Sequence, residues 1–224
     1  WEAHLGHSQS LFVNASTWAL MLTGRVVKLE DDDRRDYARV LRRLIHRSGE
    51  PVIRNAVMQA MRIMGRQFVM GRDIDEALER AKASERKGYR YSYDMLGEAA
   101  RTMADSNAYY RAYLTAIGAI GRQARARGTI ESPGISVKLS ALHPRYEFGQ
   151  RDRVMSELLP RLRDIARAAA RHDINLCIDA EETERLDLSL DLIEAVSGDP
   201  ELADWQGFGL AVQAYQKRAA PLID

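Results

Sequence analysis

The stretch ISVKLS at residues 135–140 is an apolar run interrupted by a lysine, Lys138. Three further runs have the same form, apolar with one polar residue near the end: YRYSYDML (89–96) with Asp94, LCIDAEE (176–182) with Asp179, and GFGLAVQAY (207–215) with Gln213. Parallel strands covered by helices are almost wholly apolar. A lysine and carboxylates there carry a large desolvation cost unless they face one another, a ligand or water. The pattern therefore predicts a site at the strand ends.

Helical patterns separate these runs. We expect helices near 105–126, 150–172 and 183–196, and such alternation is typical of βα units and a parallel sheet. No G-x-G-x-x-G or P-loop motif lies at a strand–helix turn, which argues against a doubly wound nucleotide-binding fold. In (β/α)8 barrels the functional groups stand at the C-terminal strand ends, where all four polar residues fall. The prediction is an α/β chain in which 87–224 forms the first half of a TIM-like barrel, its first four βα units.

Residues 1–86 have helical periodicity instead. Within them, DIDEALERAKASERKG (73–88) begins with a capping acid and continues with charges spaced for i, i+4 pairs. We expect a capped helix with a solvated outer face. The change of rhythm at Gly88 sets the predicted boundary between a helical arm domain, 1–86, and the βα region, 87–224.

The composition is that of a globular chain. Its 224 residues are 46% hydrophobic, with 33 Lys and Arg against 32 Asp and Glu, so the charge gives no reason to expect nucleic acid or a membrane surface as a partner. The single cysteine, Cys177, lies in an apolar run and is expected to be a buried thiol. Lack of a disulfide framework fits a reducing, cytoplasmic compartment. Because the chain opens on Trp1 and stops at AAPLID, we expect a piece of a longer polypeptide.

A lysine beside carboxylates is compatible with three chemistries. It can hold a substrate carboxylate, form a Schiff base if desolvation removes its proton, or neutralise the acids. Glu98 lies one helical turn beyond the first acid and joins the candidate site. His143 is expected to fix its own turn, and Glu181 or Glu182 to cap the following helix. A metal site is not expected, since the sequence has no paired histidines, cysteine pairs or H-x-x-E motif.

Four long segments resemble one family. They are YSYDMLGEAA (91–100), ISVKLSALHPRYE (135–147), IDAEETERLDLSLDLIEAV (178–196) and GFGLAVQAYQKRA (207–219). In this order they are similar to the proline dehydrogenase domain of the bacterial bifunctional proline utilization flavoenzymes. Upstream, GEPVIRNAVMQAMRIMGRQFVMG (49–71) resembles the helical domain that precedes the barrel in that family. The resemblance covers nearly the whole chain and implies a flavin-dependent barrel that oxidises L-proline to Δ1-pyrroline-5-carboxylate, with hydride transfer to FAD and electrons passed to membrane quinone.

The resemblance also implies roles for single residues. Lys138 matches the lysine that pairs with the substrate carboxylate, and Lys138 and Asp179 are the expected catalytic residues. Glu98 is expected to support substrate binding, paired with an arginine from later in the chain. The expected cofactor-binding residues are Asp94, Met95, Asp179, Ala180, Ala211 and Gln213.

For the parent enzyme the resemblance implies an aldehyde dehydrogenase domain that uses NAD, and a cytoplasmic location with peripheral inner-membrane association when the flavin is reduced. It leaves homo-oligomeric assembly open. The later strands of the barrel, with further FAD- and carboxylate-binding residues, and the DNA-binding module of the family are not recognised in the sequence. This segment alone is therefore expected to bind FAD poorly, to turn over no proline and to contact no nucleic acid.

Two other hypotheses stay open at this point. One is a Schiff-base lyase on the same barrel with Lys138 as the nucleophile, which borohydride trapping would support and a flavin spectrum would oppose. The other is a non-catalytic helical scaffold whose βα part is a truncated relic.

Overall fold

The computed structural model describes residues 58, 61–124 and 127–223 of the chain. The chain divides into two compact units, Trp1–Gly71 and Arg72–Asp224. In the first unit residues 61–68 are helical, and the helical structure expected over 1–57 lies outside the described residues.

The division falls before helix α3 (Ile74–Glu85), whereas the sequence predicted a boundary after it, at 86/87. The reason is that α3 packs against helix α4 (Met103–Ala124), and the amide of Gln123 donates to Glu85 Oε2 at 3.2 Å. The expected capping of α3 is confirmed, because the Asp73 carboxylate accepts the backbone N–H of Glu76.

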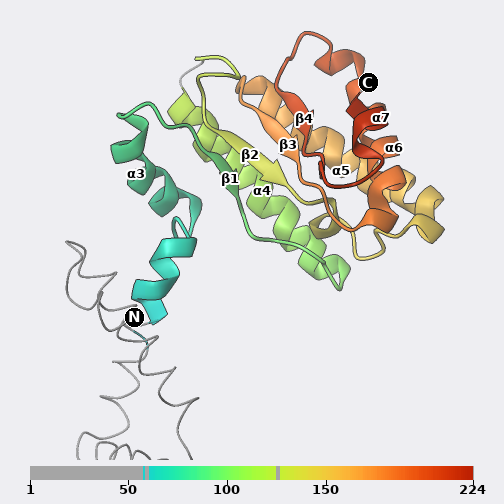
Figure 1. Ribbon diagram of the computed structural model, residues 1–224, viewed down its shortest axis with the longest axis horizontal. Helices are drawn as coiled ribbons and strands as arrows, with labels where there is room; N and C mark the ends of the chain where they lie inside the picture. The colour runs from blue at the N-terminus through green and yellow to red at the C-terminus, as the bar shows by residue number, and fades with distance from the viewer. Residues whose placement is uncertain (1–57, 59–60, 125–126, 224) are drawn as a thin grey trace, which may run out of the picture. The chain divides into compact units, whose positions relative to one another are not determined.

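The second unit is built on a four-stranded parallel sheet (Figure 1). Its strands are β1 (Ser92–Asp94), β2 (Gly134–Val137), β3 (Leu176–Ile178) and β4 (Phe208–Leu210), and they lie side by side in chain order. They alternate with α4, α5 (Arg151–Arg171), α6 (Leu186–Ser197) and α7 (Ala219–Ile223). Short 3-10 helices cover Leu139–Ala141, Phe148–Gln150, Thr183–Arg185 and Pro200–Leu202. The predicted α/β class and the alternation of strands and helices are confirmed.

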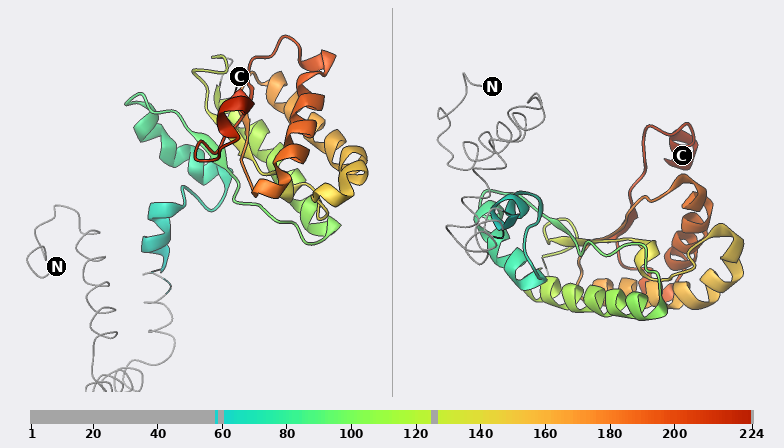
Figure 2. Two further views of the ribbon diagram at one scale, coloured as in Figure 1. Left: turned by 45° about the vertical axis from the view of Figure 1, so that its right-hand side comes forward. Right: turned by 90° about the horizontal axis from the view of Figure 1, so that it is seen from below.

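Helices cover one face of the sheet. In α5, Leu158, Leu162 and Ile165 are fully buried at helical spacing, and in α4 Ile117 and Ile120 are fully buried. The right-hand view of Figure 2 shows α4 and α5 running along one side of the strands. The large side chains of the strands that are buried alternate along the chain: Tyr93, Ile135, Val137, Leu176 and Ile178. These two sets of side chains make the core.

The other face of the sheet is more polar. Ser92 and Ser136 pair across β1 and β2, with their Oγ atoms 3.0 Å apart. Cys177 continues this row on β3, paired in register with Ser136, and is half-buried instead of buried as predicted. Burial and the nearby Asp179 raise the pKa of its thiol. The correction follows from the strand period, because Cys177 lies between the buried residues Leu176 and Ile178 and so points to the opposite face.

Within residues 61–124 and 127–223, no helix is both long enough and apolar enough to cross a bilayer.

Two glycines of α4, one turn apart, predict opposite effects of the same substitution. A Cβ on Gly118 would meet only the end of the Arg122 side chain, at 3.6 Å, so Gly118→Ala should raise the free energy of unfolding by about 0.5–1 kcal/mol. A Cβ on Gly121 would lie 2.2 Å from Cγ of His172, so Gly121→Ala should lower it by about 1–3 kcal/mol. Urea unfolding of both variants checks this; stabilisation by both would contradict the packing of α4 on the end of α5.

Candidate functional site

The three charged residues expected at the strand ends lie together. Lys138 directly follows β2, Asp94 closes β1 and Asp179 directly follows β3. The Lys138 Nζ donates to Asp94 Oδ2 at 2.6 Å and to Asp179 Oδ2 at 2.9 Å. The lysine side chain is 18% exposed, and those of the two acids are 33% and 24% exposed. The central strand thus contributes a cation that lies between anions from the two neighbouring strands.

This arrangement fixes the charge of Lys138. Burial of the ammonium favours loss of its proton, but the hydrogen bonds to Asp94 and Asp179 and their charges outweigh burial. The pKa of Lys138 is therefore raised above its ordinary value. The side chain is a protonated hydrogen-bond donor at neutral pH, which is the form that binds a carboxylate and not the form that attacks a carbonyl.

Tyr113 of α4 forms a hydrogen bond with the backbone of Lys138. Its hydroxyl accepts the backbone N–H of Lys138 at 3.2 Å and donates to the carbonyl of Gly97 at 3.4 Å. The side chain is buried, and burial raises the pKa of the phenol to about 12. Sequence reasoning missed Tyr113, because it lies in the apolar stripe of α4 with Ile117 and Ile120 and so looks like a core residue.

The loop between β1 and α4 carries Glu98, and we call residues 95–100 the Glu98 loop. Leu96 and Ala99 in this loop have left-handed backbones, with φ of 58° and 48°. Non-glycine residues there cost about 1–3 kcal/mol each and persist where the surroundings hold them. Ser140 does so: its Oγ accepts the N–H of Ala99 at 3.0 Å, and its carbonyl accepts the N–H of Ala100 at 2.9 Å.

A pocket of about 330 Å³ opens at these strand ends. Four of the expected site residues line it: Glu98, Lys138, Ala180 and Gln213. Asp94 and Asp179 are linked to it through Lys138. Ala211 lines a neighbouring, smaller pocket, and Met95 is half-buried and lines neither of the two. The structure therefore brings residues of all four strand ends to one region.

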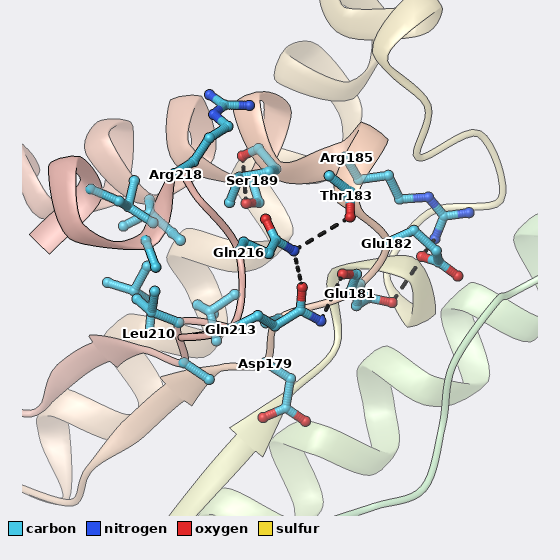
Figure 3. A pocket seen from close by; sticks show the side chains of 18 of the residues that line it. Asp179, Glu181, Glu182, Thr183, Arg185, Ser189, Leu210, Gln213, Gln216 and Arg218 are labelled. Carbon is cyan, nitrogen blue, oxygen red and sulfur yellow. Dashed lines mark hydrogen bonds and ion pairs between the residues drawn. The ribbon is translucent and has the colours of Figure 1, made fainter.

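Gln213 belongs to a chain of amides between the segments after β3 and β4 (Figure 3). Its Nε2 donates to the carbonyl of Glu181 at 3.3 Å, and its Oε1 accepts from Gln216. Gln216 in turn contacts the hydroxyl of Thr183 at 3.3 Å. Figure 3 also shows the Asp179 carboxylate pointing away from this chain of amides. The network leaves Gln213 with one further N–H to donate.

His143 acts in its own turn, as predicted. Its ring is buried, its Nδ1 accepts the backbone N–H of Arg145 at 3.1 Å, and its Nε2 lies 3.0 Å from Glu157 Oε2. An Nδ1 that accepts carries no proton, so Nε2 is the donor to Glu157.

The predicted capping by Glu181 or Glu182 is wrong. Glu182 stands at the N-cap of the 3-10 helix Thr183–Arg185 without a side-chain capping bond, and its carboxylate pairs with Arg185 at 3.0 Å. Glu181 Oε2 instead accepts the N–H of Ser140 at 3.0 Å. Both carboxylates are thus engaged elsewhere: Glu182 and Glu181 pair with the Arg185 guanidinium, at 3.0 and 4.0 Å, and Glu181 also accepts a partly buried amide N–H.

In the part of the chain that the structure describes, no group of three or more His, Cys, Asp and Glu side chains is placed to hold a metal ion.

Two family models match the chain. The model described as "Proline dehydrogenase" matches residues 77–224. The model described as "DNA-binding domain of Proline dehydrogenase" matches residues 1–68. The second match overturns the expectation that the DNA-binding module of the family is missing from this segment. It also weighs against the expectation that the segment contacts no nucleic acid, which is not retained.

Curated relatives match over the full chain. The bifunctional protein PutA of Salmonella typhimurium is 55% identical over 224 residues, and that of Escherichia coli is 54% identical. PutA of Rhizobium meliloti is also 54% identical over 224 residues. The chain spans 17% of the length of the first two and 18% of the third.

Solved structures agree with these relatives. A crystal structure of a variant of proline utilization A from Bradyrhizobium japonicum is 55% identical, with a TM-score of 0.65 over 81% of this chain and 18% of that chain. A structure of proline utilization A from Bdellovibrio bacteriovorus, at 22% identity, shares the fold with a TM-score of 0.66 over 72% of this chain and 18% of that chain. The chain therefore belongs to the proline dehydrogenase family and is similar, over its whole length, to a part of PutA.

Proposed function

We propose that this site oxidises L-proline to Δ1-pyrroline-5-carboxylate with FAD, as the first step of proline catabolism. The observation that carries the proposal is the protonated Lys138, held by Asp94 and Asp179 where it lines a pocket at the strand ends. Membership of the proline dehydrogenase family supports the choice of substrate.

Lys138 is the proposed partner of the substrate carboxylate. An ammonium has three N–H donors, and the bonds to the two aspartates use two of them. The third is available for a charge-assisted bond to a carboxylate oxygen. Asp179 and Asp94 act by holding the ammonium protonated and in place. Glu98 lines the same pocket and is the proposed acidic contributor to substrate binding.

The residues at the strand ends fit part of a flavin. When bound, FAD supplies the acceptor for the hydride that leaves the proline ring carbon next to nitrogen. The proposed cofactor-binding residues are Asp94, Met95, Asp179, Ala180, Ala211 and Gln213. The small side chains Ala180 and Ala211 permit close approach of a flat ring, and Gln213 keeps one N–H for a heteroatom. A pocket of about 330 Å³ suits a ring system better than a whole dinucleotide.

Further proposals concern the whole protein. The four-stranded sheet is the proposed first half of a (β/α)8 barrel, and this half alone is proposed to bind FAD poorly and to be inactive. Electrons are proposed to pass to membrane quinone, with peripheral inner-membrane contact and a cytoplasmic location otherwise. An aldehyde dehydrogenase domain that uses NAD would oxidise the product in the same polypeptide.

The Schiff-base lyase is the weaker candidate, because the raised pKa of Lys138 keeps its amine protonated. A scaffold without catalysis gives no reason to place an ammonium and two carboxylates at a pocket.

Removal of the Lys138 charge tests the electrostatic account. Lys138→Met should lower the free energy of unfolding of the full-length protein by roughly 2–3 kcal/mol at neutral pH, because two partly buried carboxylates lose their partner. The folded pKa of Lys138 is raised, so its contribution is complete below its ordinary value of 10.5 and is lost as pH rises through the folded value. The difference from wild type should therefore be constant from pH 7 to 9 and shrink above about 10.5.

The matched control is Lys82→Met, which removes an exposed pair with Glu79 and should cost less than about 1 kcal/mol. Equal losses in the two variants would contradict the special role of Lys138.

The activity is tested by titrating the flavin absorbance of the full-length protein with L-proline under anaerobic conditions. Wild type should show a bound flavin that L-proline bleaches. Lys138→Met should weaken L-proline binding by about 2–5 kcal/mol while flavin content stays near that of wild type, because a charge-assisted pair to the substrate is lost. A protein without flavin, or a flavin that proline leaves oxidised, would refute the proposed function, and borohydride trapping on Lys138 would then favour the lyase.

A further inference from the structure

The Glu98 loop is held in a backbone conformation that its own residues do not favour. Leu96 and Ala99, on either side of Glu98, have φ of 58° and 48°, in the left-handed region. Neither is a glycine, asparagine or aspartate, the residues that adopt this region most readily. Such a conformation is maintained by contacts from elsewhere in the fold.

The contacts come from two hydroxyl side chains. Tyr113 donates to the carbonyl of Gly97, and the Ser140 Oγ accepts the N–H of Ala99. The Ser140 carbonyl also accepts the N–H of Ala100. The bonds fall immediately before and immediately after Glu98, so they fix the backbone that carries its carboxylate.

The Glu98 loop also packs closely against α4. A Cβ on Gly97 would lie 2.5 Å from Cδ1 of Tyr109, so the loop backbone rests directly on the tyrosine ring of α4. At the start of the loop, Asp94 Oδ1 accepts the N–H of Leu96 at 2.7 Å. The carboxylate that holds Lys138 through Oδ2 therefore also begins the loop through Oδ1.

One of these hydroxyl residues contacts Lys138 directly, and the other is close to it in the chain. Tyr113 accepts the lysine backbone N–H at 3.2 Å, and Ser140 stands two residues beyond the lysine. The N–H of Ser140 is taken by Glu181 Oε2, after β3. Tyr113 is 1% exposed and Ser140 is 4% exposed, so solvent does not compete for these bonds.

We propose that Tyr113 and Ser140 are positioning residues that hold Glu98 and Lys138 in one fixed relation across the pocket, and that this relation sets the affinity for an amino-acid substrate. The choice of substrate rests on the proposed function. Glu98 and Lys138 line one pocket with opposite charges, so their relative placement sets the electrostatic environment that a bound substrate meets. Loss of either hydroxyl frees the strained loop, so Glu98 spends less time in place.

The steady-state test uses Tyr113→Phe and Ser140→Ala in the full-length enzyme with L-proline. Each should raise KM about three- to ten-fold, since each removes a buried hydrogen bond to the loop, while kcat changes less than two-fold. Ser140→Thr, which keeps the hydroxyl, should restore most of the affinity. The matched control is Tyr110→Phe, one turn earlier on α4, whose hydroxyl contacts Asp164 instead of the loop and whose loss should leave KM unchanged.

A double-mutant cycle separates positioning from general stability. In a Glu98→Ala background, Ser140→Ala should raise KM no further, because its hydroxyl bonds only the loop that carries Glu98, and Tyr113→Phe should raise KM less than in wild type, because only its bond to the Lys138 backbone is then left to lose. Rises of the same size with and without Glu98, or no rise at all, would overturn the proposal.

Amide hydrogen exchange tests the loop independently of any substrate. Ser140→Ala should accelerate exchange at Ala99 at least ten-fold, and Tyr110→Phe should leave it unchanged. Unchanged exchange at Ala99 in Ser140→Ala would overturn the positioning role. If L-proline does not bleach the flavin of the wild-type protein, the proposed function is refuted. The positioning role of Ser140 is still tested in that case, because hydrogen exchange is measured without substrate.

Discussion

One ammonium between two carboxylates organises this end of the molecule. Lys138 follows the second of three neighbouring parallel strands, and Asp94 and Asp179 come from the strands on either side. Without the lysine, two acids would face each other across β2 in partly buried positions. The cation therefore allows three neighbouring strand ends to carry charged side chains, and the loops after these strands begin at the charged residues. Asp94 Oδ1 also accepts the N–H of Leu96, and the Tyr113 hydroxyl accepts the backbone N–H of Lys138. These two bonds connect the charged residues to the loop after β1 and to α4.

The sequence was sufficient to place the charged residues because the strand period is read from neighbouring residues, and the alternation of strands with helices implies that the strands are parallel. An apolar run with one polar residue near its end brings that residue to the same edge as its counterparts. The same rules overestimate strand length. The run at 135–140 yields only Gly134–Val137 as strand, since a 3-10 helix begins at Leu139, and the run at 207–215 yields only Phe208–Leu210. The charged site residues lie at the last strand position or directly after it: Asp94 ends β1, and Lys138 and Asp179 follow β2 and β3.

The supporting hydroxyls could not be found this way. Tyr113 contacts Lys138 from 25 residues away, and Ser140 contacts Ala99 from 41 residues away. Tyr113 has the spacing of a core residue, and Ser140 looks like any serine after a strand. The left-handed Leu96 and Ala99 carry no signal either, because glycine or asparagine is the usual marker of that conformation. Glu181 was misassigned for the same reason, since helix capping is a local rule and its partner, the N–H of Ser140, is distant in sequence.

The charge balance of the site bears on what else must be near it. Lys138 carries one formal positive charge and its two partners carry two negative charges, so the triad has a net formal charge of −1. Glu98, Glu181 and Glu182 line the same pocket, and Arg185 pairs with both Glu181 and Glu182, so these four side chains add further net negative charge. A substrate carboxylate that binds the third N–H of Lys138 therefore approaches a region of negative potential, and one hydrogen bond does not offset that repulsion. The proposed function thus requires at least one further cation at the pocket. This is the physical reason to look for arginines from later strands, which the family resemblance led us to expect, and for a partner to Glu98 among them.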